Sequence, residues 1–304
     1  MPTPLNGPVV QSAVNISEGR CEPVMRAIAA AAQGCPGAVL ADCSSDPDHN
    51  RMVATLLGRP DAVVDAVMAC ARLAVEHIDM REHEGAHPRV GAVDVIPLVP
   101  IREVPLEDCL DLAMALGRRL GDELALPVYL YERSARPGRS AGLPEIRRGG
   151  FESLATRAAG GVCTPDLGPR VPHSTAGAVV VGVRDPLVAA NLVLDQRDPR
   201  IAAGIAADIR RDRVDHPGLQ GVRALGLALP SRGVSQVSLN LTLPSQTPLP
   251  HVFGYVRKEA SARGAAVTQT EVVGLLPLAC LAGASPSAIG WSSHRPAQII
   301  DNWL

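Results

Sequence analysis

Apolar and polar positions follow two different repeats along the first half of the chain, and the two repeats alternate. Continuous or every-second apolar positions, typical of strands, occupy residues 8–14, 38–43, 51–57 and 91–99. Apolar positions at the three- and four-residue spacing of a helix occupy residues 22–32 and 60–77. Their order predicts a β-α-β-β-α-β unit, the split arrangement of ferredoxin-like folds. A helix at 106–120 and a strand at 128–131 extend it, before a loop-like segment rich in Gly, Pro and Arg at 133–148.

A second cycle of strands and helices follows Gly177. Strands are predicted at 178–183, 187–194, 222–228, 236–243 and 265–276, and helices at 200–211 and 252–263. The pattern therefore predicts an α/β (α+β) fold of two ferredoxin-like α/β subdomains, with mixed sheets and with helices on the outer faces. We expect the first subdomain to span residues 1–167 and the second 178–285, with a connector at 168–177 and an irregular tail at 286–304.

Composition narrows the classes of function. A formal charge of −2 and an aromatic content of 2% argue against binding of nucleic acid through bulk charge or base stacking. No apolar run reaches the roughly 20 residues that a membrane span needs, and the N-terminus does not resemble a secretory signal. The seven cysteines are scattered and form no C-x-x-C pair. We therefore expect a cytoplasmic protein with reduced thiols that acts on small molecules, without nucleic-acid or membrane partners.

The densest group of polar residues lies at 80–89, between a predicted helix and a predicted strand, where a rigid scaffold holds site residues. It contains His83-Glu84-Gly85-Ala86-His87, the H-E-x-x-H pattern that binds zinc when a helix brings both histidines to one face. Gly85 weakens a helix there, and Pro88 disfavours the helical conformation at His87. A zinc hydrolase stays an alternative, but the favoured interpretation is His87 as a single general base, with no metal.

Two further polar segments have ordinary structural explanations. Residues 42–51 combine Asp, Asn and Pro as a turn does, and they lack the glycine and the distal glutamate of a calcium-binding EF-hand loop. Residues 168–177 contain two prolines and two glycines, which is typical of a stiff connector.

Seven blocks of sequence extend these observations. They are N-I-S-E-G-R at 15–20, D-P-D-H-N-R at 46–51, I-D-M-R-E-H-E-G-A-H-P-R-V-G-A-V-D-V at 78–95, P-V-Y-L-Y at 127–131, L-P-E-I-R at 143–147, P-D-L-G-P at 165–169 and V-S-Q-V-S at 234–238. In this order they resemble the formiminotransferase family, the glutamate formimidoyltransferases, from about residue 12 to residue 282. The chain resembles the stand-alone members, which lack a cyclodeaminase domain.

The resemblance implies an activity and a set of site residues. The activity is transfer of the formimino group of N-formimino-L-glutamate to N5 of tetrahydrofolate in histidine degradation, which gives 5-formiminotetrahydrofolate and L-glutamate. The family's catalytic histidine matches His87, and a homodimer is usual. We expect supporting positions around the substrates at Asn50, Arg51, Arg89 and Ser44. The folate-contacting connector matches Gly168, Pro169, Arg170, Val171, Pro172, His173, Ser174, Thr175, Ala176 and Gly177.

Two positions depart from the family pattern. Ile16 stands where phenylalanine is common, and Ser44 stands where vertebrate members carry aspartate. These departures leave open a second class of function, a homologue that binds folate or an amino acid without turnover.

The residues suit the implied chemistry. N5 of the folate becomes cationic when it attacks the amidine carbon, and one imidazole with a pKa near ~6.5 can remove that proton and return one to the departing glutamate nitrogen. We therefore expect an acid limb of the rate at about pH 6–7. Both substrates carry carboxylates, which arginine binds through two parallel hydrogen bonds. Arg89 is the favoured receptor among Arg89, Arg133, Arg136, Arg139 and Arg170.

Overall fold

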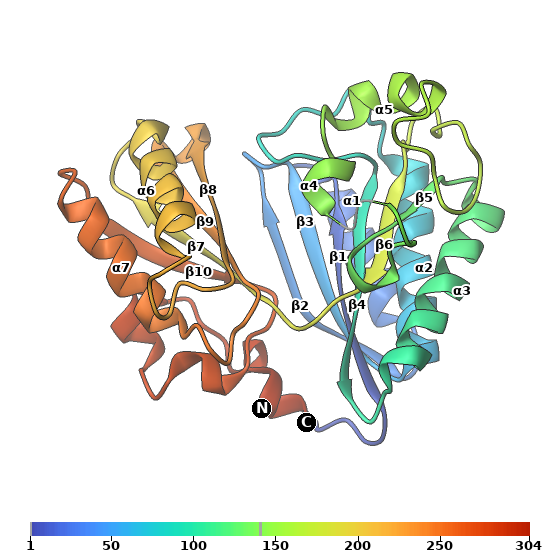
Figure 1. Ribbon diagram of the computed structural model, residues 1–304. Helices are drawn as coiled ribbons and strands as arrows, with labels where there is room; N and C mark the ends of the chain where they lie inside the picture. Colours follow the sequence, from blue (N-terminus) through green and yellow to red (C-terminus); the bar gives the residue numbers. More distant parts are fainter. Residues whose placement is uncertain (1, 140–141) are drawn as a thin grey trace. The chain divides into compact units, whose positions relative to one another are not determined.

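The computed structural model of the protein describes residues 2–139 and 142–304, and the chain divides into two compact units (Figure 1). The first unit is Leu5–Asp185. The second is Pro186–Leu304, which residues 2–4 join. Each unit has its own sheet and its own hydrophobic core.

The first unit contains a six-stranded sheet in the order β2-β3-β1-β4-β6-β5. The strands are β1 (Val9–Ile16), β2 (Ala38–Asp46), β3 (Arg51–Gly58), β4 (Val93–Arg102), β5 (Val128–Leu130) and β6 (Val179–Val183). The first four strands pair antiparallel in the order of a ferredoxin-like unit. Strand β6 then pairs parallel with both β4 and β5, so the sheet is mixed.

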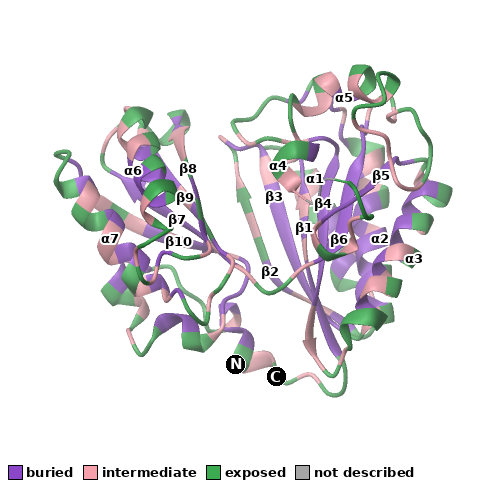
Figure 2. Cartoon of the chain, in the orientation of Figure 1, coloured by how far each residue is buried: buried purple, intermediate pink, exposed green. Residues whose placement is uncertain are grey.

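Helices cover one face of this sheet, and a smaller layer covers part of the other. The helices α1 (Glu22–Gln33), α2 (Pro60–His77) and α3 (Leu106–Leu124) pack with one set of alternate strand residues into the main core. The other set includes Val95, Tyr129 and Val180, which pack with α4 (Leu143–Ile146) and α5 (Gly150–Ala159). A short 3₁₀ turn, η1 (Glu132–Ser134), follows β5. The central strands are buried as a result (Figure 2).

The second unit contains a four-stranded antiparallel sheet in the order β10-β7-β9-β8, again ferredoxin-like. Its elements are β7 (Val188–Leu194), α6 (Pro199–Asp212), β8 (Val222–Leu229), η2 (Pro230–Arg232), β9 (Val234–Leu241), α7 (Leu249–Ser261) and β10 (Val267–Val273). Gly226 on β8 is required by packing, because any side chain there would overlap the backbone of α6 at Ala202 and Ala203.

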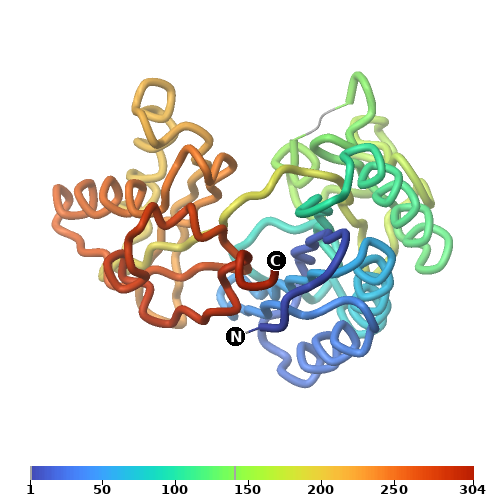
Figure 3. The backbone as a smooth tube through the Cα atoms, turned by 90° about the horizontal axis from the view of Figure 1, so that it is seen from below, coloured from blue at the N-terminus to red at the C-terminus, as the bar shows by residue number. Residues whose placement is uncertain are grey.

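The C-terminal tail consists of 3₁₀ turns but is part of the second core. The turns are η3 (Leu278–Leu281), η4 (Pro286–Ile289), η5 (Pro296–Gln298) and η6 (Ile300–Trp303). Trp291 is only 1% exposed and packs among the core residues of this unit. The tail, red in Figure 3, therefore stabilises the second unit, although its backbone is irregular as expected.

The fold class is confirmed, but the expected boundaries are wrong. The segment at 178–183, expected to open the second subdomain, is strand β6 of the first sheet, because its backbone pairs in parallel with β4 and β5. The second unit begins at Pro186, so residues 168–177 lie inside the first unit and do not join the two. The second sheet is antiparallel and not mixed. Helix α5 was not predicted, and within the described residues no helix is both long and apolar enough to span a membrane.

Candidate active site

The loop that carries both histidines of the H-E-x-x-H pattern runs from α2 to β4, and we call residues 78–92 the site loop. It is fixed on two sides by backbone hydrogen bonds. The N–H of Met80 donates to the Thr175 carbonyl over 2.8 Å, and that of Ala92 to the Ala176 carbonyl over 2.9 Å. On the other side the N–H of Ala86 donates to the Asp48 carbonyl over 3.0 Å. The site loop therefore lies between the connector and the β2–β3 turn (residues 46–51).

Asn50 joins three of the sequence blocks named above into one site. Its backbone has a positive φ of 47°, which Asn tolerates better than most residues. Its Oδ1 accepts the N–H of Gly19 over 2.9 Å, and its Nδ2 donates to the Glu84 carbonyl over 3.0 Å. Asn50, which was predicted to support the site, thus links the 15–20 block, the β2–β3 turn and the site loop through its side chain.

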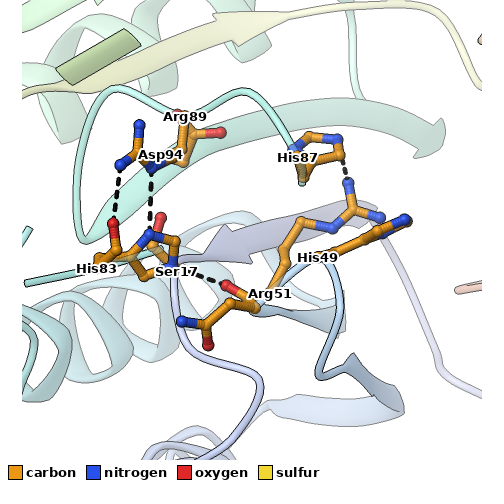
Figure 4. Close-up of a pocket in the computed structure, with 8 residues that line it drawn as sticks. Ser17, His49, Arg51, His83, His87, Arg89 and Asp94 are labelled. Carbon is orange, nitrogen blue, oxygen red and sulfur yellow. Dashed lines mark hydrogen bonds between the residues drawn. The ribbon is translucent and has the colours of Figure 1, made fainter. Parts of the chain in front are cut away.

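His87 presents one ring nitrogen as an acceptor. Its Nδ1 lies 2.8 Å from the Pro88 carbonyl, which can only accept, so Nδ1 carries the proton. The lone pair is then on Nε2, which accepts a hydrogen bond from Nη1 of Arg51 over 2.7 Å (Figure 4). The structure thus holds His87 as a neutral imidazole, the form that a general base requires.

Burial and nearby cations keep His87 neutral. Burial lowers its pKa well below the ordinary value, and the charges of Arg51, Arg147 and His49 lower it further, in that order. The rings of His49 and His87 lie 5.7 Å apart between centroids. Burial also lowers the pKa of Arg51, to about 10, so that Arg51 stays cationic at neutral pH.

His83 is a buried structural residue. Its Nε2 lies 2.9 Å from the Asn50 carbonyl, and its Nδ1 accepts from Nε of Arg89 over 3.1 Å, so both ring nitrogens are engaged. The H-E-x-x-H pattern lies after the end of α2 at His77 and is not helical, so the two imidazoles do not share a helix face. Among the residues that the structure describes, no three His, Cys, Asp or Glu side chains are grouped to hold a metal. The geometry thus gives no support to the zinc hydrolase alternative.

Two arginine–carboxylate pairs brace the site loop. Arg89 forms two parallel hydrogen bonds with Glu152 on α5, over 2.7 and 3.0 Å. Arg147, which follows α4, pairs with the buried carboxylate of Asp94 on β4. All three nitrogens of the Arg89 guanidinium are engaged by the protein, so Arg89 braces the site loop, and its role as a substrate receptor stays a prediction. Arg147 was part of a sequence block but was not singled out as a site residue.

Three of the other candidate arginines are also engaged. Arg133 pairs with Asp185 over 2.6 Å, Arg136 donates to the Asp166 carbonyl over 2.8 Å, and Arg139 donates to the Thr164 carbonyl. Arg170 is exposed on the connector. Ser44 is half-buried on β2, opposite Val53, and lies outside the pocket described below.

The connector closes on itself through a backbone bridge between His173 and Gly177. The Nδ1 of His173 accepts the N–H of Ala176 over 3.0 Å, which shapes the turn. Exposed positions on this turn are Gly168, Pro169, Arg170, Val171 and Ser174.

A small pocket lies beside His87. Its lining residues are Ser17, His49, Asn50, Arg51, His83, His87, Arg89 and Asp94 (Figure 4). Side chains fill it so closely that no volume for a water molecule is left.

The sequence was compared with known families and proteins. Residues 9–184 match the family model of the formiminotransferase domain, N-terminal subdomain, and residues 189–290 match that of the formiminotransferase domain. The chain is 37% identical to a glutamate formimidoyltransferase of Streptococcus pyogenes, with 90% of both chains covered. It is 39% identical to a glutamate formimidoyltransferase of Thermoplasma acidophilum, with 88% of both chains covered. It is 40% identical to the formimidoyltransferase-cyclodeaminase of Sus scrofa, in a match that includes 91% of this chain and 52% of the relative. The chain therefore spans about half the length of that relative.

Proposed function

Because this chain belongs to the formiminotransferase family, we propose that it is a glutamate formimidoyltransferase, which moves the formimino group of N-formimino-L-glutamate to N5 of tetrahydrofolate. The observation that supports this most directly is the tautomer of His87. Its Nε2 carries a lone pair, and the imidazole is kept neutral by burial and by two arginines. A transfer between two nitrogen atoms needs such a base.

Nε2 of His87 serves both proton transfers of the reaction. N5 of tetrahydrofolate bonds to the amidine carbon of the donor and becomes cationic, and Nε2 of His87 takes the proton from N5. The bond between the amidine carbon and the glutamate nitrogen then breaks, and the imidazolium returns the proton to that nitrogen. The products are 5-formiminotetrahydrofolate and L-glutamate, and His87 is neutral again. A lowered pKa suits both steps, because N5 is a weakly basic aryl amine and the imidazolium must release its proton readily.

The connector is our candidate for the folate contact. Its Thr175 and Ala176 carbonyls accept from Met80 and Ala92 of the site loop, so a pterin held on Gly168–Gly177 would lie beside the loop that carries His87. Pro169 and Pro172 restrict the connector, which lowers the entropy that binding must remove. Asn50 would hold the site loop in place, and Ser44 stays a predicted supporting position.

The deciding experiment is a direct assay of 5-formiminotetrahydrofolate formation by the purified protein. We expect turnover that depends on both substrates and that His87→Gln lowers by about 10²–10⁴-fold. Saturable tetrahydrofolate binding without any product at saturating donor would favour the alternative, a binding homologue without turnover.

We also propose a homodimer in the cytoplasm, as in the family. The seven cysteines are all present as thiols, which suits a reducing compartment. Sedimentation at micromolar concentration would refute the dimer if it gave only the mass of one chain.

A further inference from the structure

Arg51 is a largely buried cation that contacts only neutral acceptors. Its Nη1 donates to Nε2 of His87 over 2.7 Å and reaches Oδ1 of Asn15 over 3.4 Å. Within the described residues no carboxylate lies within ion-pair distance of it, and Asp94 and Asp46 act on it only from farther away. A buried guanidinium without a carboxylate partner is costly, so this position favours an anion.

A second guanidinium adds to the positive charge of the same site. Arg147 pairs with Asp94, but its Nε is buried and has no hydrogen-bond partner. Its charge is felt by both Arg51 and His87. Of the two arginines, then, one lacks a carboxylate and the other has an unused donor.

The formimino donor of the proposed reaction carries an anion close to its reacting carbon. In N-formimino-L-glutamate the α-carboxylate is three bonds from the amidine carbon, so a carboxylate must lie near the imidazole that serves that carbon. In the structure Arg51 occupies the lone pair of His87, and side chains fill the pocket beside it. Nε2 cannot accept a proton until Arg51 moves.

We propose that Arg51 and Arg147 together receive the α-carboxylate of the formimino donor, and that this withdraws Arg51 from Nε2 of His87. The inference rests on the proposed function. A carboxylate offers two charge-assisted hydrogen bonds to a guanidinium, whereas the neutral imidazole offers one uncharged acceptor, so the exchange favours the donor. The base is then exposed only when the donor is bound.

The test measures binding separately from turnover, with L-glutamate, the product, as the probe. Arg51→Gln and Arg147→Gln are compared with the wild type by calorimetry and by the KM values of both substrates. We expect L-glutamate affinity to fall, and the donor KM to rise, about 10- to 100-fold, with the tetrahydrofolate KM unchanged. Arg26→Gln, which removes an exposed arginine on α1, is the matched control and should change neither value.

Further readouts separate this role from a structural one. Arg147→Gln leaves the buried carboxylate of Asp94 without its partner, so Arg147→Lys, which keeps the charge but not the planar fork, is measured beside it and should bind L-glutamate with intermediate affinity. The groups that act on His87 are Arg51, Arg147, His49 and the Pro88 carbonyl. Arg51→Gln removes one cation from this set, so the acid limb of kcat/KM should move to higher pH.

Wild-type affinity for L-glutamate in Arg51→Gln, or an equal rise of both KM values, would overturn the inference. A wild-type protein that binds L-glutamate through Arg51 but makes no product would overturn the proposed function and leave the carboxylate site standing.

Discussion

Replacing Gly85 by alanine perturbs the position of His87 without touching the imidazole. Gly85 lies in the site loop against the β2–β3 turn. A Cβ added there would overlap the carbonyl oxygen of His49 and lie 2.9 Å from its carbonyl carbon and 3.0 Å from Cβ of Asn50. Ordinary carbon contacts are about 3.5–4.0 Å, so the loop and the turn must separate by about 1 Å.

The size of the effect follows from the contacts that this separation strains. The two hydrogen bonds across the gap, from Ala86 to Asp48 and from Asn50 to Glu84, are both 3.0 Å long. Overpacking costs about 1–3 kcal/mol and each weakened hydrogen bond up to about 1 kcal/mol, so we expect the free energy of unfolding to fall by about 2–4 kcal/mol. That is less than the roughly 5–15 kcal/mol of a typical protein, so the variant folds. A misplacement of about 1 Å near the reacting atoms lowers kcat by about 100-fold.

The assay is kcat for 5-formiminotetrahydrofolate formation together with urea unfolding. Gly254→Ala on α7 is the control, because nothing lies within 4 Å of an added Cβ there and an alanine inside a helix adds about 0.5–1 kcal/mol. Gly85→Ala with wild-type kcat and wild-type stability would refute the idea that this close approach positions the base.

Four further outcomes follow from the same structure. His87→Ala should lower kcat by about 10²–10⁴-fold with folate binding retained, whereas His83→Ala should mainly lower stability, by about 1–3 kcal/mol; equal losses of kcat would contradict the single base. Because the pKa of His87 is lowered, the acid limb of kcat/KM should lie below pH ~6.5, and an unchanged limb in His87→Gln would assign it to another group. Burial lowers the pKa of His49, His83 and His87 alike, so the unfolded chain binds more protons than the folded chain below about pH 6.5. The free energy of unfolding is therefore retained above about pH 6.5 and falls below it. A urea midpoint that is equal at pH 7.5 and 5.5 would disprove this. Added folate should slow hydrogen exchange at 168–177, and protection confined to other segments would move the folate site.

Local patterns in the sequence determined the elements and most of the chemistry. The helix predicted at 60–77 matches α2 because Pro60 suits a first turn and the apolar stripe ends at His77. The β-α-β-β-α-β order predicted the first ferredoxin-like unit, and a second cycle of strands and helices predicted the other. The confirmed family resemblance led to His87 and Arg51. Pro88 also indicated correctly that His87 is not on a helix.

Contacts between distant residues decided the rest. An apolar strand at 178–183 can open a new unit or complete the previous one, and only its parallel pairing with β4 and β5 placed it in the first sheet. Arg89 and Glu152 are 63 residues apart, and Arg147 and Asp94 are 53 apart. No short sequence motif could therefore predict either pair. Those pairings engage the guanidinium of Arg89 and bring Arg147, which the sequence did not single out, to the site. Which ring nitrogen of His87 carries the lone pair also depends on the tertiary structure, because packing brings Arg51 to Nε2 and the Pro88 carbonyl to Nδ1. Charges and hydrogen bonds act through space and not along the chain.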